Sequence, residues 1–229
     1  MHPALVTLND SKSVAAEAYR TLRTNIQFAK LDLPCRSIVI TSAAPEEGKT
    51  ISVANFGVVS AQAGSRVCLV DSDLRRPSLH RLFGVRNDCG LTTALLESRP
   101  VVDVAQPSMI TNLWVLPSGP LPRDPVDLVG SQRMRDFLRE AGETFDLLLC
   151  DSPPILAVAD AAALAAQCDG VILVIRAGKI AHDSLSRAVS QIEAVKGRIL
   201  GVLLNRVDTR GDSYYRDYRS CARYYEAGD

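Results

Sequence analysis

The stretch SIVITSAAPEEGKTISVANFGVVSAQ, residues 37–62, decides the fold. It begins with an apolar run typical of a buried strand, passes through AAPEEGKT at residues 43–50, and continues with helical spacing. A strand, a loop and a helix in this order are what a phosphate-binding loop requires. In such a loop, backbone N–H groups and the helix N-terminus surround the phosphates. GKT alone also fits an ordinary turn at a helix start, so the strand before it carries the argument.

Each residue type in this loop has a chemical task. Gly48 lets the backbone approach a phosphate, Lys49 neutralises the terminal phosphates, and the Thr50 hydroxyl ligates Mg²⁺. Ala43 occupies the first position, where the general pattern GxxxxGK[ST] has glycine. The residues expected to contact the nucleotide here are Ala44, Pro45, Glu46, Glu47, Gly48, Lys49, Thr50 and Ile51.

A second apolar run, VCLVDSDLRRP at residues 67–77, ends in two carboxylates that are two positions apart. Residues i and i+2 of a strand point the same way, so Asp71 and Asp73 can converge on one site if the strand continues. One carboxylate can then belong to a Mg²⁺ shell while the other accepts a proton. The alternative is an ordinary exit from a strand, with Asp73 paired to Arg75 or Arg76.

A third apolar run, DLLLCDSPP at residues 146–154, delivers Asp151 to the end of another strand. Mg²⁺ takes few carboxylates and keeps several waters, so Asp151 suits the surroundings of such an ion. The alternative is that Asp151 caps the next helix. All three motifs fall at the carboxyl ends of predicted parallel strands, where such sheets bind ligands. Together they predict a nucleotide and Mg²⁺ site that includes Thr50, Asp151 and one of the two carboxylates Asp71 and Asp73.

Apolar runs alternate with segments of helical spacing through most of the chain. This order predicts an α/β fold with a mostly parallel sheet and helices on both faces. Residues 14–30 carry the stripe of an amphipathic helix, whereas PSGPLPRDP, residues 117–125, has four prolines and indicates a loop. We expect one compact domain over residues 1–207 and a flexible tail over 208–229. The predicted strands are 37–41, 67–70, 113–116, 146–150, 171–175 and 199–204.

The composition limits the partners of the chain. Lys plus Arg number 26 and Asp plus Glu number 26, so no overall basic field draws the chain to nucleic acid or anionic lipid. The longest apolar runs are strand-sized, far short of the roughly 20 residues needed to cross a bilayer, and the start lacks the pattern of a secretion signal. The six cysteines lack the spacing of a zinc site. We expect a cytoplasmic protein with reduced thiols and no nucleic-acid partner.

Tyrosines are concentrated at the end of the chain, where no core is predicted. Five of the six lie in the last 16 residues, interleaved with arginines. Beside a phosphoryl donor, such tyrosines are candidate acceptors. The alternatives are a strand that docks onto the domain and a surface that stacks single-stranded nucleic acid. The candidate acceptors are Tyr214, Tyr215, Tyr218, Tyr224 and Tyr225.

The first predicted helix contains EAYRTLR, which places Glu17, Arg20 and Arg23 at three-residue steps on one polar face. By physical chemistry alone this is a solvated face, with a Glu17–Arg20 pair worth a few tenths of a kcal/mol.

Together these motifs resemble those of the bacterial tyrosine kinases of capsule and exopolysaccharide synthesis. The resemblance covers nearly all of residues 14–225. The family's Walker A motif is matched by the AAPEEGKT loop, its DxDxR motif by Asp71, Asp73 and Arg75, and its Walker B strand ending DSPP by Asp151. Family members also end in a tyrosine cluster.

The chain departs from the family pattern at two places. The family usually has glycine after the proline of the phosphate loop, where this chain has Glu46. The family's proline loop usually reads PPNP, where this chain has PRDP at residues 122–125. Neither departure removes a residue with an assigned chemical role.

The resemblance implies an autokinase that uses ATP and Mg²⁺ and transfers the γ-phosphate to tail tyrosines of a neighbouring subunit. It implies that Asp73 is the general base and that Asp71 belongs to the Mg²⁺ shell. It also implies that Lys49, Asp71 and Asp151 are the other catalytic residues and that Asn205 is a further nucleotide contact.

The resemblance also implies partners. It assigns the face of Glu17, Arg20 and Arg23 to subunit contacts in a homo-oligomeric ring, which replaces the solvated-face interpretation. Family members are activated by a membrane-bound polysaccharide co-polymerase, fused or separate, and the opening of this chain looks like the linker that follows such a membrane portion. The expected location is the inner face of the plasma membrane.

Two other functions fit parts of the pattern. Regulatory ATPases of the partition and cell-division-site type share the fold but carry an additional lysine near the start of the phosphate loop, where this chain has Ala43 and Ala44. A nucleotide-switched adaptor without kinase activity would use the same site, and its tail would acquire no phosphate from ATP.

Overall fold

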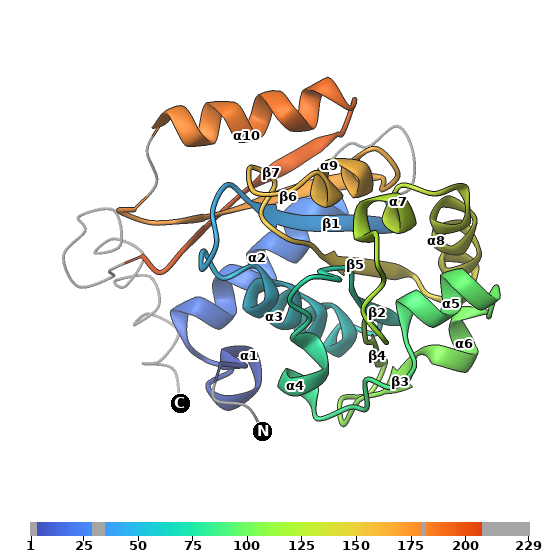
Figure 1. The fold of residues 1–229 in the computed structure, drawn as a ribbon. Coiled ribbons are helices and arrows are strands. Elements are labelled where there is room, and N and C mark those ends of the chain that lie inside the picture. Colours follow the sequence, from blue (N-terminus) through green and yellow to red (C-terminus); the bar gives the residue numbers. More distant parts are fainter. Residues whose placement is uncertain (1–3, 29–34, 180–181, 208–229) are drawn as a thin grey trace.

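A seven-stranded sheet runs through the middle of the molecule, with helices on both faces (Figure 1). The computed structural model describes residues 4–28, 35–179 and 182–207. The strand order is β3-β4-β2-β5-β1-β6-β7, and every neighbouring pair is parallel except β3 with β4. The predicted α/β class is therefore confirmed. The strands are β1 Ser37–Ser42, β2 Val67–Asp71, β3 Gln106–Pro107, β4 Leu113–Leu116, β5 Leu147–Asp151, β6 Gly170–Arg176 and β7 Ile199–Asn205.

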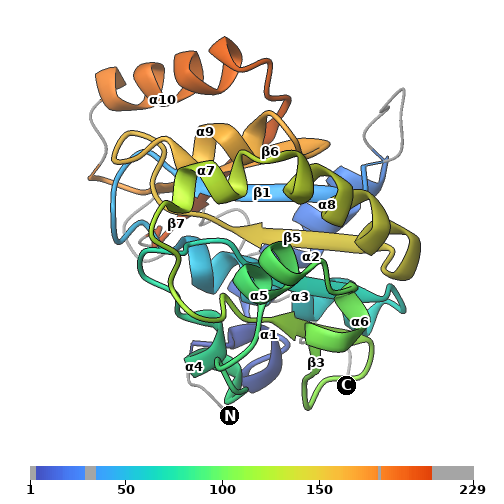
Figure 2. The same cartoon turned by 45° about the vertical axis from the view of Figure 1, so that its right-hand side comes forward.

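The helices form two layers, one on each face of the sheet (Figures 1 and 2). One layer, α1 to α4, packs on a core around Phe56, and the other, α5 to α10, packs on a core around Phe137. The helices are α1 Val6–Asn9, α2 Val14–Phe28, α3 Lys49–Gln62, α4 Leu79–Phe83, α5 Leu91–Glu97, α6 Val101–Val104, α7 Pro125–Val129, α8 Gln132–Thr144, α9 Asp160–Ala165 and α10 His182–Ala194.

The central strands are buried on both faces, which explains their unbroken apolar runs. In β1, Ile38 and Ile40 belong to the core beneath α3, whereas Val39 belongs to the core on the opposite face. Successive side chains of a strand point to opposite faces, so a strand covered by helices on both sides needs apolar residues at every position. All six residues of β1 are buried.

The predicted strands match the observed ones to within one residue at each end. The prediction missed β3, a two-residue antiparallel strand too short to show a pattern. It was wrong at the last residue of the loop 117–125, because Pro125 begins α7. Proline is tolerated there, since the first N–H of a helix has no intrahelical partner. The helix predicted over 14–30 is α2, and residues 29–30 lie outside the described residues, as does the predicted tail.

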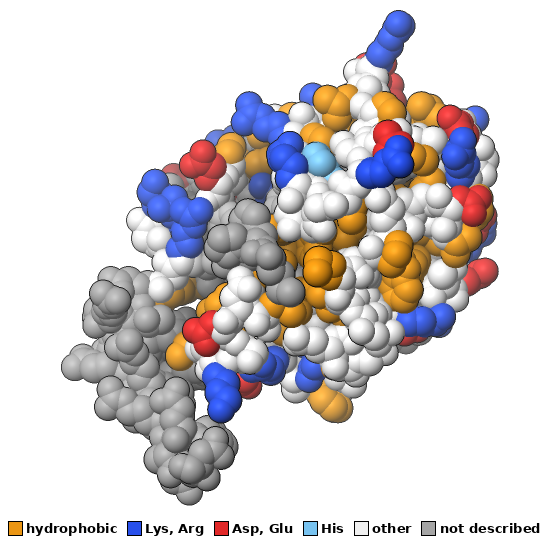
Figure 3. All heavy atoms as spheres, turned by 90° about the horizontal axis from the view of Figure 1, so that it is seen from below, with side chains coloured by type: hydrophobic (Ala, Val, Ile, Leu, Met, Phe, Trp, Pro, Cys, Tyr) orange, Lys and Arg blue, Asp and Glu red, His pale blue; other side chains and the backbone are white. Residues whose placement is uncertain are grey.

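The surface mixes charges of both signs. On the face shown in Figure 3, acidic and basic side chains are interspersed around patches of apolar side chains. This mixture agrees with the equal numbers of basic and acidic residues in the sequence. In the described residues, no helix is long and apolar enough to cross a membrane.

A buried asparagine joins α1 to the middle of α3. The Oδ1 atom of Asn55 accepts hydrogen bonds from the backbone N–H of Thr7 at 3.1 Å and from its hydroxyl at 2.8 Å. The Nδ2 atom of Asn55 donates to the carbonyl oxygens of Ala4 at 3.0 Å and Ile51 at 2.9 Å. Both Asn55 and Thr7 are fully buried. This side chain therefore satisfies polar groups that water does not reach.

We predict that Asn55→Ala lowers the free energy of unfolding by about 2–4 kcal/mol, because it leaves two buried donors of Thr7 without a partner and opens a cavity. Urea denaturation followed by circular dichroism measures the change. Asn25→Ala is the matched control: Asn25 is exposed on α2, and its loss should change stability by no more than about 0.5 kcal/mol. Equal effects of the two substitutions would contradict the structural role of Asn55.

Candidate nucleotide and phosphoryl-transfer site

The three motif-bearing strands lie side by side in the sheet, in the order β2-β5-β1. Asp71, the last residue of β2, is in register with Asp151, the last residue of β5. Because these strands are parallel, their carboxyl ends meet at one edge, and α3 begins at the same edge after β1. The structure therefore brings the phosphate loop and the two strand-end carboxylates together, as the sequence predicted.

Thr50 and Asp151 are in direct contact. The Thr50 hydroxyl donates to Oδ2 of Asp151 at 2.6 Å, and the Ser78 hydroxyl donates to Thr50 Oγ1 at 3.3 Å. Asp151 is buried, and α9 begins only at Asp160. The alternative that Asp151 caps the next helix is therefore wrong.

The capping role falls to Asp71 instead. Its Oδ2 atom accepts the backbone N–H groups of Ser78 and Leu79, both at 2.9 Å, at the start of α4. Asp71 is fully buried. This contact uses one carboxylate oxygen and fixes the side chain in place.

One oxygen of each carboxylate remains without a protein partner. Oδ1 of Asp71 and Oδ1 of Asp151 are buried and accept no hydrogen bond from the described residues. A buried carboxylate oxygen without a partner is costly. Two such oxygens beside a threonine hydroxyl are the hard donors that Mg²⁺ prefers, so these residues fit the expected ion.

The two carboxylates have raised pKa values. Burial is the largest cause for Asp71, opposed by its two backbone N–H donors and reinforced by the charge of Asp73, and its pKa rises to about 6. Burial is also the largest cause for Asp151, followed by repulsion from Asp71, and its pKa rises to about 8 although Thr50 and Lys49 oppose the shift. A cation bound between these groups would remove both causes.

Asp73 reaches the site from a turn. Strand β2 ends at Asp71, so the condition that the strand continues is not met. Oδ1 of Asp73 accepts the backbone N–H groups of Arg75 at 3.3 Å and Arg76 at 2.9 Å. The charge of Asp73 still raises the pKa of both strand-end carboxylates. Asp73 therefore lies near them, held by a local turn instead of by strand geometry.

Arg75, which the sequence offered as an ion-pair partner of Asp73, pairs with a different carboxylate instead. The Arg75 guanidinium contacts Asp160 through Nε at 3.0 Å and Nη2 at 3.4 Å. The Asp160 side chain is 2% exposed and lies at the start of α9. This clamp joins the turn that carries Asp73 to the segment after Asp151. Sequence reasoning missed Asp160, although a single acid within the apolar stretch LAVADAAALAA was a signal.

The phosphate loop is braced by its own glutamate. Glu47 is 4% exposed, and its Oε2 accepts the N–H of Ala44 at 3.0 Å while its Oε1 accepts the N–H of Arg176 at 3.5 Å. The Asn205 Nδ2 donates to the Glu47 carbonyl oxygen at 2.8 Å. Asn205 thus contacts the loop from the end of β7, and its contact with a nucleotide stays a prediction.

Two loop positions have left-handed backbone. Gly48 has φ +99°, and a Cβ atom there would clash with the Asn205 amide, so glycine is required. Glu46 has φ 62°, a conformation that costs a non-glycine residue about 1–2 kcal/mol. This explains why the family usually has glycine where this chain has Glu46.

The predicted subunit-contact residues make contacts within the chain. Arg20 donates to Glu17 at 2.8 Å and to the carbonyl of Ser11 at 2.7 Å. Arg23 is half-buried and donates to the carbonyl oxygen of Val59 on α3 at 3.2 Å. The five candidate acceptor tyrosines lie outside the described residues.

Comparison with known proteins gives the family of this chain. A family model described as an AAA domain matches residues 35–204. The chain is 40% identical over 218 residues to tyrosine-protein kinase YwqD of Bacillus subtilis, covering 95% of this chain and 92% of that protein. It is 32% identical to the putative tyrosine-protein kinase CapB of Staphylococcus aureus, covering 90% and 91%. The chain belongs to the bacterial tyrosine-protein kinases.

Solved structures agree. The kinase domain of Escherichia coli tyrosine kinase ETK matches with a TM-score of 0.86 and 32% identity, covering 91% of this chain and 82% of that chain. The cell division ATPase MinD of Pyrococcus furiosus matches with a TM-score of 0.64 and 28% identity, covering 77% and 74%. The cell division ATPase, which represents the alternative function, therefore shares the fold of this chain. The ETK kinase domain matches a larger share of this chain, 91% against 77%. The chain spans 30% of the Salmonella typhimurium tyrosine-protein kinase wzc.

We predict that the metal-free kinase loses stability as the pH rises from about 5 to about 8.5. Asp71 and Asp151 have folded-state pKa values above the usual value near 3.9. The stability that their protonated forms contribute is therefore fully present below about pH 3.9, and it is lost as the pH rises through about 6 and about 8. Mg²⁺ should restore the melting temperature at pH 8.5, by roughly 4 °C or more, and have little effect at pH 5.

Thermal unfolding with EDTA and with excess Mg²⁺ measures both effects, and Asp151→Asn is the comparison variant. Asparagine cannot ionise, so the variant should show a shallower loss of stability with pH and a smaller response to Mg²⁺. If the melting temperatures of the variant and the parent fell equally with pH, the buried carboxylates would not be the cause of the pH dependence.

Proposed function

We propose that this kinase is an autokinase, which transfers the γ-phosphate of ATP to tyrosines in the tail of a neighbouring copy and thereby regulates polysaccharide synthesis and export. The observation that carries the proposal is the pair of unpartnered buried oxygens of Asp71 and Asp151 beside the Thr50 hydroxyl. They lie where α3 presents its N-terminus, which favours bound phosphates.

The residues around this pair have separable roles. Gly48 and the first N–H groups of α3 receive the phosphates, and Lys49 neutralises their charge. Thr50, Asp71 and Asp151 hold Mg²⁺, which supplies positive charge to the phosphate oxygens. Asn205 holds the loop from the end of β7.

Asp73 is the proposed general base. A tyrosine hydroxyl has a pKa of about 10 and is a weak nucleophile at neutral pH. Asp73 takes the hydroxyl proton as the tyrosine oxygen bonds to the γ-phosphorus, and the bond from that phosphorus to the leaving ADP oxygen breaks. The backbone bonds to Asp73 both use Oδ1. This arrangement leaves Oδ2 for the proton.

We also propose a ring of subunits and an activator at the inner face of the plasma membrane. Breaking the exposed Glu17–Arg20 pair for a partner subunit costs only a few tenths of a kcal/mol. The chimerical protein CapA2B2 matches with a TM-score of 0.85 and 34% identity, covering 90% of this chain and 91% of that chain. We infer from this likeness that CapA-like proteins are activators of this kinase.

We predict that Asp73→Asn slows phosphoryl transfer about 10²–10⁴-fold and leaves ATP affinity unchanged. Asparagine keeps the Oδ1 that accepts the two turn N–H groups, so the turn survives while the base is lost. Single-turnover labelling with γ-³²P-ATP measures the rate, and calorimetry measures the affinity. Asp103→Asn, an exposed acid on α6, should behave like the parent. Equal transfer rates for Asp73→Asn and the parent would contradict the proposal that Asp73 is the general base.

We predict that transfer occurs between subunits. A Lys49→Met chain with an intact tail is mixed with an active chain that lacks residues 212–229, and labelled ATP is added. Label should appear on the inactive chain, and tandem mass spectrometry should place it on the candidate tail tyrosines. If the intact parent is labelled but the mixture is not, each chain modifies only itself. If neither is labelled, the chain is not an autokinase.

A further inference from the structure

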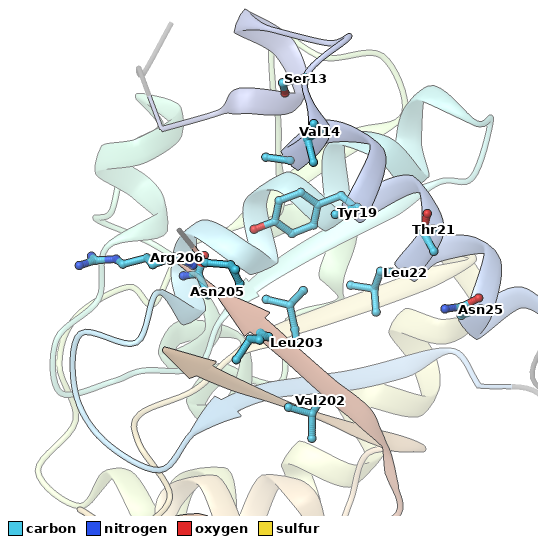
Figure 4. A pocket seen from close by; sticks show the side chains of 14 residues that line it. Ser13, Val14, Tyr19, Thr21, Leu22, Asn25, Val202, Leu203, Asn205 and Arg206 are labelled. Atoms are coloured by element: carbon cyan, nitrogen blue, oxygen red, sulfur yellow. Dashed lines mark hydrogen bonds between the residues drawn. The ribbon is translucent and has the colours of Figure 1, made fainter. Parts of the chain in front are cut away.

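A cavity of about 580 Å³ lies between α2 and β7, outside the site described above (Figure 4). Leu22 projects from α2 toward Leu203 of β7, whereas the Tyr19 hydroxyl donates to the Ser52 hydroxyl of α3 at 3.4 Å. The lining from α2 also includes Val14 and Ala18, so most of this wall is apolar. A smaller cavity continues along the same two elements past Ile26 and Leu200.

The cavity follows the edge of β7. Its lining includes every residue from Val202 to Val207. The smaller cavity that continues it also touches Ile172 of β6, so the two cavities lie beneath α2 at the margin of the sheet that β7 forms. β7 is the last strand in the sheet order, so in the described residues its outer edge pairs with no strand.

This edge lacks the usual protection against pairing. Proteins commonly guard edge strands with charged residues, proline or a covering segment. β7 reads ILGVLLN, without charge or proline, and Val202 and Leu204 are 53% and 54% exposed. An extended segment can form backbone hydrogen bonds with such an edge and bury its apolar side chains. The cavity therefore fits an added strand.

The nearest extended segment is the continuation of the same chain. Val207, the last described residue, is part of the lining, and 22 residues follow it. At about 3.3 Å per residue those residues can reach roughly 73 Å, whereas the seven residues of β7 span roughly 23 Å. A tethered segment also has an effective concentration in the millimolar range. Its tyrosines favour strands and suit an apolar wall.

We propose that in the nucleotide-free kinase the tail, residues 208–229, turns back and pairs as an added strand with the free edge of β7, its tyrosines against α2. The alternative occupants are the tail of a second copy and a strand of another protein. Docking does not depend on the proposed function. If the tail is phosphorylated, however, each added charge of about −1.5 to −2 opposes its return to an apolar groove.

Trypsin tests the docking, because four arginines of the tail are cleavage sites: Arg210, Arg216, Arg219 and Arg223. In the full chain without nucleotide, these sites should be cut at least about tenfold more slowly than in a synthetic peptide of residues 208–229. The double variant Val202→Lys, Leu204→Lys charges the edge and should raise cleavage to the rate of the peptide.

The matched control is Leu96→Lys with Val102→Lys, two exposed apolar residues of α5 and α6, and it should leave the tail protected. A second variant, Tyr214→Ser with Tyr215→Ser and Tyr218→Ser, changes only the tail and should also abolish protection. Cleavage of the parent at the peptide's rate, or protection that survives the charged edge, overturns the proposal. Protection that disappears on dilution assigns the groove to another copy's tail and also overturns it. No ATP is present, so these results leave the kinase proposal unaffected.

Discussion

The register of β2 with β5 is the constraint on which the rest of this site depends. It places Asp71 opposite Asp151 at the buried ends of two strands, so two carboxylates share a volume that water does not reach. The surrounding contacts follow from that placement: Thr50 donates to one carboxylate, the start of α4 donates to the other, and one oxygen of each is left over. A cation is the natural complement of these two oxygens, because it relieves both the desolvation and the mutual repulsion.

Around this pair, the chain holds its phosphate loop with its own side chains. It has no lysine at Ala43 or Ala44, and a buried glutamate, Glu47, braces the phosphate loop against Ala44 and the end of β6. The turn that carries Asp73 is likewise fixed from outside, by the contact of Arg75 with Asp160. Only one partner of that pair is buried, so removing Arg75 would leave Asp160 as a buried charge.

The sequence predicted the sheet well because central strands covered on both faces must be apolar at every position. The three motifs were placed correctly for the same reason, since each follows such a strand. The prediction failed where a contact joins distant segments: Asp160 holds Arg75 across 85 positions, and no periodicity reveals such a pair. It also could not distinguish a strand from a turn at Asp73, because two residues beyond a strand end show no pattern. The left-handed backbone at Glu46 is visible only in coordinates.

The hydrogen bonds of Asn55 connect α1 to α3. They fasten Ala4 and Thr7 to the middle of α3, the helix that follows the phosphate loop. Because one buried side chain joins the two segments, a displacement of the chain near Ala4 also displaces the middle of α3. Asn55 therefore couples the position of the first described residues to the helix that begins at the phosphate loop.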